Sequence, residues 1–160
     1  MKQNRIKEKA LTSLATLGFV GRMPGAPGTW GSLVAVILAP WLFIPFSLSV
    51  KIVILGLLFL VGSLACSSAE KTFGRKDPGQ AVIDEVLGQW TTFLFITQAS
   101  FFNLALGFFL FRLFDITKPF PIRRSENWLP RGYSVMLDDL LAGIYALAVL
   151  TLILKLTARI

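Results

Sequence analysis

Six residues of this chain have side chains and positions suited to chemistry: an acid pair near residue 84, an aspartate and a lysine near residue 115, and an acid pair near residue 138. The chain has no histidine and one cysteine, which excludes histidine bases, histidine-rich metal sites and thiol pairs. Acids that share a poorly solvated site repel one another, and a divalent cation relieves that repulsion. Oxygen-only ligands favour Mg²⁺, which commonly combines one or two carboxylates with substrate phosphate. The residue types therefore predict Mg²⁺-assisted chemistry by Asp84, Glu85, Asp115, Lys118, Asp138 and Asp139.

The spacing of these acids limits how they can act together. Adjacent residues on an α-helix point about 100° apart, so the two acids of a pair cannot both face one metal ion. We expect one acid of each pair to contact the metal and the other to form a hydrogen bond or ion pair behind it. Gln89 follows Glu85 by four residues and shares its helix face. Gly88 and Gly143 each follow an acid by four residues, where a missing side chain would let two helices approach closely.

The composition indicates that the helices carrying these residues lie in a membrane. The 160 residues are 54% hydrophobic and only 16% charged, which is typical of an integral membrane protein. Mean hydropathy is +0.68. The net charge of +7 suits an anionic membrane surface or an anionic substrate. No nucleic-acid-binding motif is present, so we expect no nucleic-acid partner.

Breaks in the apolar pattern separate the predicted helices, and we expect these helices to form a single domain over residues 1–160. We predict an all-α, polytopic membrane helix bundle of about five helices, preceded by a basic helix that lies on the membrane surface. A loop rich in proline and glycine at residues 24–32 precedes the first of the five, and Thr29 or Ser32 could cap it. Pro119 should end the fourth helix near Lys118. The predicted helices are about Ser32–Phe46, Ile52–Ala69, Ala81–Ile96, Phe101–Phe114 and Val135–Leu156.

Charge predicts the orientation of these helices. Basic residues gather before Gly28, at residues 71–76 and at residues 118–131, and such segments face the cytoplasm. Five crossings satisfy this rule and bring the acids of all the clusters to the cytoplasmic face. The alternative is a single long crossing from about Trp90 to Phe114, which would put Asp115 on the opposite face from Asp84.

Several polar residues near the acids are candidates for substrate binding, and each also has a purely structural interpretation. Thr29 and Ser32 could serve only as helix caps. Arg112 could pair with Asp115 at a spacing of three residues. The arginines of the basic segments could serve only to fix topology. The substrate-binding candidates are Thr29, Ser32, Gln89, Arg112 and Arg123.

Four sequence blocks, in order, resemble the phosphatidylglycerophosphatase A family. They read APGTWGSL at 26–33, DPGQ followed by IDEVLGQW at 77–90, FDITKPFPI at 114–122 and MLDDLLAG at 136–143. The resemblance spans nearly the whole chain. It implies a Mg²⁺-dependent lipid phosphatase of the bacterial inner membrane that converts phosphatidylglycerophosphate to phosphatidylglycerol. One departure is that residues 131–134 contain a single glycine where the family has a glycine-rich connection, which argues against a flexible closing loop there.

The resemblance and the residue types together suggest a mechanism. Mg²⁺ would be held by Asp84, Asp115 and one or both of Asp138 and Asp139, Glu85 would orient a water, and Lys118 would stabilise developing charge. An aspartyl-phosphate intermediate is the main alternative. A different class of function, a small cation transporter or channel component, would use the same acids staggered along the depth of the bilayer. The sequence leaves open the oligomeric state and activity on related lipid phosphates.

Overall fold

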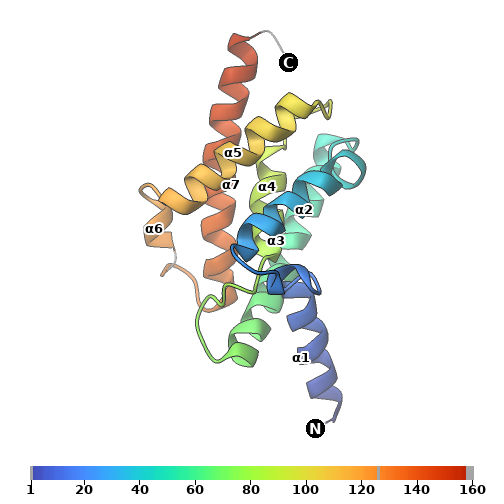
Figure 1. The fold of residues 1–160 in the computed structure, drawn as a ribbon, viewed down its shortest axis with the longest axis vertical. Coiled ribbons are helices and arrows are strands. Elements are labelled where there is room, and N and C mark those ends of the chain that lie inside the picture. The colour runs from blue at the N-terminus through green and yellow to red at the C-terminus, as the bar shows by residue number, and fades with distance from the viewer. Residues whose placement is uncertain (1, 126, 158–160) are drawn as a thin grey trace.

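The computed structural model describes residues 2–125 and 127–157, and within these ranges it contains helices and no strand (Figure 1). Seven α-helices and one 3-10 turn follow one another along the chain. They are α1 (Lys2–Ala15), η1 (Val20–Arg22), α2 (Pro27–Leu42), α3 (Leu48–Phe73), α4 (Ile83–Thr92), α5 (Phe101–Thr117), α6 (Ile122–Ser125) and α7 (Gly132–Leu156).

The short helix α4 lies at the centre of the bundle, and all ten of its residues are buried. It contacts α1, α2, α3, α5 and α7. On one side Trp90 stacks on Phe43 with ring centroids 5.2 Å apart, and its indole N–H donates to the carbonyl oxygen of Ala35 at 2.9 Å. On another side Leu87 packs in a cluster with Met136. This burial fixes the orientation of α4 and of the acids in its first turn.

Two glycines let α4 and α7 meet backbone to backbone, as their spacing from the acids predicts. A Cβ atom on Gly143 would lie 2.4 Å from the carbonyl oxygen of Gly88, and one on Gly88 would lie 2.7 Å from that of Asp139. Any larger residue would push the helices apart. The close contact brings the first turn of α4 beside the acid pair of α7.

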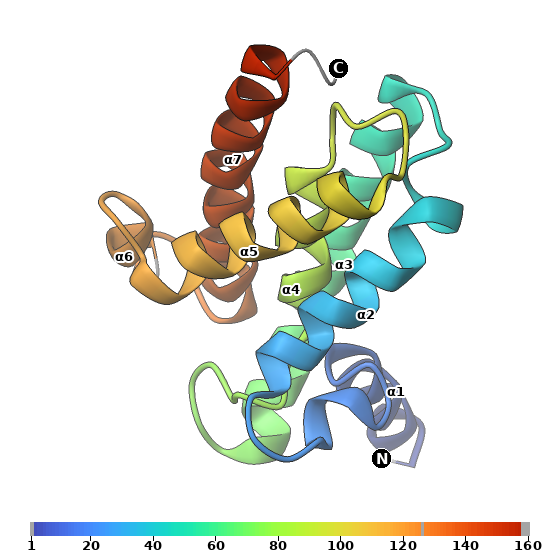
Figure 2. The ribbon, with the colours of Figure 1, turned by 45° about the horizontal axis from the view of Figure 1, so that its top comes forward.

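The direction of the chain alternates through the bundle. In Figures 1 and 2, α2, α4 and α7 run upward, and α3 and α5 run downward. The turn between α4 and α5 makes this possible, because α4 ends at Thr92 and the Ser100 hydroxyl caps α5 by accepting the N–H of Asn103 at 3.1 Å. The alternative of one continuous helix over residues 90–114 is therefore wrong.

The observed helices differ from the predicted ones mainly at their ends. α2 begins at Pro27, with Ala26 at its N-cap, so Thr29 and Ser32 lie inside the helix and neither caps it. α4 is shorter than predicted because the chain turns after Thr92, where the N–H of Leu94 bonds back to Thr91 O. α7 begins a turn earlier than predicted, and the short helix α6 was not anticipated.

Two described helices, α3 and α7, are long and apolar enough to cross a membrane. The helix α2 is also apolar but has only 16 residues. Large apolar side chains are exposed along the outside of the bundle. Examples on α2, α3, α5 and α7 are Ile37, Trp41, Ile52, Val53, Leu57, Leu60, Phe109, Leu113, Ile144 and Leu152. An outer surface of this kind matches a lipid environment better than water.

Candidate active site

Six carboxylates and two cations line one pocket of about 290 Å³, where the first turns of α2 and α4 meet the end of α5 and the start of α7. With every group ionised, the side chains carry a formal charge of 2 − 6 = −4. The lining includes all six catalytic candidates from the sequence. The charged residues are Asp77, Asp84, Glu85, Asp115, Asp138, Asp139, Arg112 and Lys118. The expectation that the acids of separate segments meet is confirmed.

A tight connection before α4 sets the position of Asp84 and Glu85. The N–H of Ala81 bonds to the carbonyl oxygen of Pro78 at 2.7 Å, and the N–H of Val82 bonds to that of Ala15 at 2.8 Å. α4 then starts at Ile83, which places both acids in its first turn. Negative side chains there are stabilised by the unpaired N–H groups of the helix end.

Arg112 joins two of the acids. Its Nη1 atom lies 2.6 Å from Oε2 of Glu85 and 2.8 Å from Oδ2 of Asp115. The Ser32 hydroxyl donates to Oε2 of Glu85 at 2.7 Å. A Cβ atom on Gly28 would lie 2.1 Å from Oε1 of Glu85, so a larger residue there would displace this carboxylate. The predicted pair between Arg112 and Asp115 is therefore confirmed, and it extends to Glu85.

Lys118 neutralises a third acid. It leaves the end of α5 with φ +41°, beyond the last helical residue Thr117, as the following proline predicts. Its Nζ atom lies 2.5 Å from Oδ2 of Asp138. The segment after Lys118 is fastened to α7, because the Tyr145 hydroxyl donates to the carbonyl oxygen of Phe120 at 3.1 Å.

Asp84 and Asp139 are the acids that the two cations do not reach. Within residues 2–125 and 127–157, neither forms an ion pair with a basic side chain. Among the described residues, Asp84 Oδ1 accepts only the N–H of its neighbour Glu85, at 3.0 Å, and Oδ2 of Asp139 is buried without a hydrogen-bond partner. Such buried carboxylates are costly unless a further positive group joins them.

Burial and crowding make the acids of α4 hard to ionise. At ten residues α4 is shorter than the usual span, and it lies outside the two candidate spans. Burial, and then the negative charge of Glu85, raise the pKa of Asp84 well above its ordinary value. Burial and the charge of Asp115 raise the pKa of Glu85 to about 7, against the opposing effect of Arg112. A bound cation would reverse this tendency.

The donor set fits a hard divalent cation that needs further ligands. All the acidic side chains offer oxygen, which suits Mg²⁺. Oδ2 of Asp139 is a buried oxygen that lacks a partner in the described chain. Among the residues that the structure describes, no group of three or more acidic or cysteine side chains converges tightly enough to enclose an ion unaided. Water or substrate oxygens would therefore have to complete the coordination, as is common for Mg²⁺.

The substrate-binding candidates divide into two groups. Ser32 and Arg112 contact the acids, as described above. Thr29 and Gln89 do not line the pocket, and Arg123 is exposed on α6 away from it. Gln89 is fully buried, and neither of its amide atoms has a hydrogen-bond partner among the described residues. Substrate contact by these three residues stays a prediction.

Asp77 also lines the pocket, although it is not among the site residues predicted from the sequence. Its backbone has φ +46°, and its N–H donates to Oε1 of Glu70 at 3.3 Å. Its charge also contributes to the raised pKa of Asp84. One feature of the sequence could have identified Asp77, because it is the first residue of the block that contains Asp84 and Glu85.

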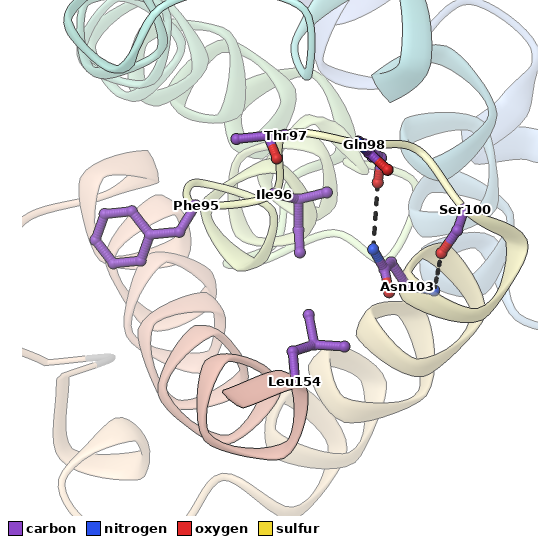
Figure 3. Close-up of a pocket in the computed structure, with 7 residues that line it drawn as sticks. All are labelled: Phe95, Ile96, Thr97, Gln98, Ser100, Asn103 and Leu154. Carbon is purple, nitrogen blue, oxygen red and sulfur yellow. Dashed lines mark hydrogen bonds between the residues drawn. The ribbon is translucent and has the colours of Figure 1, made fainter. Parts of the chain in front are cut away.

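A second cavity, of about 370 Å³, lies at the other end of the bundle, and none of the described residues that line it is ionisable (Figure 3). The α4–α5 connection forms most of it, and α7 contributes Leu154, about four turns beyond Asp139. The amide of Asn103 donates to the carbonyl oxygen of Gln98 at 3.2 Å. This cavity offers hydroxyls, amides and apolar groups and lacks the charges of the acidic pocket.

Comparison with known proteins identifies the family. The family model for phosphatidylglycerophosphatase A matches residues 13–154. The phosphatidylglycerophosphatase A of Haemophilus influenzae is 37% identical over 152 residues, covering 92% of this chain and 93% of the relative. That of Escherichia coli K12 is 34% identical, covering 92% of this chain and 86% of the relative.

A third relative, from Bacteroides thetaiotaomicron, is 36% identical over 132 residues, which cover 79% of this chain and 82% of the relative, and it carries the provisional name of a phosphatidylinositol-3-phosphatase. No solved structure matches the chain significantly. The matched residues 13–154 include every acid of the pocket. The chain therefore belongs to the phosphatidylglycerophosphatase A family of phosphatases.

Proposed function

We propose that this chain is a Mg²⁺-dependent phosphatase that hydrolyses phosphatidylglycerophosphate to phosphatidylglycerol and phosphate. The names of the two enzyme relatives support the substrate. The observation that carries the chemistry is the acidic pocket, in which Asp84 and Asp139 are buried without a basic partner in the described chain. This arrangement calls for a cation that arrives with the substrate or before it.

Asp84 and Asp139 would hold Mg²⁺, with Asp115 and Asp138 as further ligands. When bound, the ion would withdraw electron density from the phosphate and make a coordinated water more acidic. Asp115 and Asp138 are already neutralised by Arg112 and Lys118, so we assign them the smaller share of the binding.

Positive groups at the pocket wall would bind the phosphate. Arg112 and Lys118 both line the pocket. The N–H of Gly28 has no hydrogen-bond acceptor within α2, because the first backbone hydrogen bond of this helix runs from the N–H of Trp30 to the carbonyl oxygen of Ala26. N–H groups at a helix start favour phosphate oxygens. Together these groups would hold the phosphomonoester while its P–O bond to glycerol breaks.

We assign Glu85 a positioning role instead of the water-orienting role suggested from sequence. Its carboxylate already accepts from Arg112 and Ser32 and holds the guanidinium in place. With its other oxygen on the metal, Asp139 would accept a proton from the attacking water at Oδ2, which has no hydrogen-bond partner in the described chain. Water would add its oxygen to phosphorus, the glycerol alkoxide would leave, and that alkoxide would take up a proton. Labelled phosphate trapped on the protein would favour the aspartyl-phosphate route instead.

We infer that the chain sits in the bacterial inner membrane with the acidic pocket toward the cytoplasm. The two long apolar helices and the exposed apolar side chains support membrane insertion. The basic segments predict the orientation. Five crossings stay a prediction, because α2, α4 and α5 are shorter than the usual span. Tags inserted near residues 80 and 120 should be accessible from the same, cytoplasmic side.

The alternative of a cation path loses its main support. It required acids staggered along the depth of the bilayer, whereas six of the nine acids in the chain line one pocket at one end. The enzyme interpretation accounts for that grouping directly.

The test is phosphate release by the purified protein in detergent, with Mg²⁺ and with EDTA. Phosphatidylglycerophosphate is compared with phosphatidylinositol 3-phosphate, phosphatidic acid and lysophosphatidic acid at equal surface concentration. We expect phosphatidylglycerophosphate to be hydrolysed fastest, and only with the metal. Release that is unchanged in EDTA would contradict the metal requirement, and a clear preference for another lipid would contradict the substrate.

A further inference from the structure

A groove of about 550 Å³ lies between α1, α3 and the turn that leads into α7, and it shares no lining residue with the acidic pocket. Leu11, Leu64, Pro130 and the ring of Tyr133 give it an apolar lining. The two serines that line it are already engaged. Ser68 donates to the carbonyl oxygen of Glu8 at 3.1 Å, and the Ser67 hydroxyl accepts a backbone N–H at 3.2 Å. The groove therefore offers an apolar surface to whatever occupies it.

Two exposed cations, Lys71 and Arg131, line the same groove. Neither forms an ion pair within the described residues. Glu8 is the single acid among the described residues of the lining, which together carry a formal charge of +1. An apolar surface bordered by two uncompensated cations matches an amphiphile with an anionic head.

The backbone fixes Arg131 at this position. Its φ of +52° is rare for a residue with a side chain. The next residue, Gly132, is docked on α3, since a Cβ atom there would lie 2.4 Å from the backbone nitrogen of Ser67. The Gly132 N–H donates to the Ser67 hydroxyl, and the Ser134 hydroxyl donates to the carbonyl oxygen of Arg131 at 2.8 Å. Strained backbone held by such contacts is concentrated at functional sites.

Along α3 the lining of the groove changes from apolar to basic, which matches the order of the acyl chain and the phosphate in a phospholipid. Leu64 and Lys71 both line it, and they are separated by about 10 Å along the helix axis. Leu64 belongs to the apolar stretch of a candidate span, and Lys71 belongs to the basic segment that ends it. An acyl chain and its phosphate present the same order of chemistry over the same distance.

We propose that this groove binds an anionic glycerophospholipid of the bilayer. An acyl chain lies against Leu11, Leu64 and Tyr133, and the phosphodiester lies between Lys71 and Arg131. The inference rests on the proposed membrane location but not on the proposed substrate. The site is separate from the one that hydrolyses a phosphomonoester.

The test compares lipid retention by the full-length protein in neutral detergent, using native mass spectrometry with dioleoyl phosphatidylglycerol and dioleoyl phosphatidylcholine. We expect the anionic lipid to be retained preferentially. Loss of two cations in a Lys71→Gln/Arg131→Gln variant should weaken its binding about tenfold or more. Glu8→Gln should strengthen it, because this change removes the opposing charge. The matched control is Arg22→Gln/Lys155→Gln, which removes two exposed cations elsewhere and should leave retention unchanged.

Three results would overturn the proposal: equal retention of both lipids, unchanged retention in the groove variant, or an equal loss in the control. Phosphatase activity and the melting temperature are measured on the same samples. A folded groove variant that loses lipid but keeps activity supports a separate site, whereas loss of both would place these residues on the substrate path and overturn it. If the wild type retains the lipid through Lys71 and Arg131 but releases no phosphate, the groove stands and the proposed enzyme function fails.

Discussion

In the described chain, the buried charge at one end of the bundle has polar partners, whereas two buried charges at the other end lack a basic partner. At the end away from the acids, Lys51 is only 3% exposed, and its ammonium donates to the carbonyl oxygen of Ile96 at 2.7 Å and lies 5.6 Å from the centre of the Phe43 ring. At the acidic end, Asp84 and Asp139 are equally buried but have no basic partner in the described chain. A charge satisfied by the protein itself stabilises the fold, whereas an unsatisfied one marks a place where a ligand is needed.

The size of the cavities does not reveal this difference. The cavity at the end away from the acids is the larger of the two, at about 370 Å³ against about 290 Å³. The described residues of its lining include no ionisable group, while the acidic pocket holds eight. The chemistry of the lining therefore identifies the site, and the following changes test that assignment.

The largest effect should come from Asp84→Asn. This change keeps the size of the side chain but removes a carboxylate that would hold Mg²⁺, so phosphate release should fall by about a thousandfold. Gln98→Ala, in the cavity at the other end, should keep activity within about twofold because it touches none of the charged groups. Comparable losses of phosphate release in the two variants would show that the two ends do not differ in their importance for activity.

A smaller loss should follow Gly28→Ala. The added Cβ atom would overlap Oε1 of Glu85 and displace the carboxylate that holds Arg112. A displacement of about 1 Å can cost up to about a hundredfold in rate, and we expect a loss between tenfold and a hundredfold. Gly56→Ala on α3 is the matched control, since nothing lies within 4 Å of its Cβ position. Full activity in Gly28→Ala would show that this contact does not matter.

The acidic end should also make stability depend on pH. The pKa of Glu85 is raised to about 7 from 4.5, so the folded state binds more protons than the unfolded state between these values. Stability of the metal-free protein should therefore fall as pH rises through this window, by several degrees in melting temperature. Mg²⁺ should recover part of the loss at pH 8, and Glu85→Gln should reduce the slope. A melting temperature that rises from pH 5 to pH 7 in EDTA would contradict this account.

The smallest effect on activity should come from Lys51→Met. The variant loses the hydrogen bonds to Leu94 and Ile96, so the melting temperature should fall by a few degrees. Phosphate release per folded molecule should stay unchanged, because the side chain lies at the end of the bundle away from the acidic pocket. A drop in that rate without unfolding would show that the two ends are coupled.

Much of this arrangement could be predicted from the sequence, because the signals are local. The position of Pro119 predicted where α5 ends, the spacing of Gly88 and Gly143 from the acids predicted a close helix contact, and the basic segments predicted that the acids gather at one end. These features depend on residue type and helix periodicity alone.

The missed features depend on tertiary contacts that leave no local pattern. The turn after Thr92 shortens α4 to a buried core helix. Ser32 is of a residue type that caps helices, but its hydroxyl reaches across to Glu85, and Arg112 also contacts the Glu85 carboxylate. Asp77 lies in the connection between α3 and α4, and its place in the pocket depends on the fold. In each case the side chain type was informative, but its partner could be known only from the fold.

Direct measurement of divalent metal binding is the sharpest test of the central claim. Mn²⁺ replaces Mg²⁺ at oxygen sites and can be followed by electron paramagnetic resonance, with and without inorganic phosphate. The account predicts saturable Mn²⁺ binding that Mg²⁺ displaces, that Asp84→Asn abolishes and that Gln98→Ala preserves. Equal Mn²⁺ binding by Asp84→Asn and the wild type, or no saturable binding with phosphate present, would contradict the assignment of the acidic pocket as a metal-dependent active site.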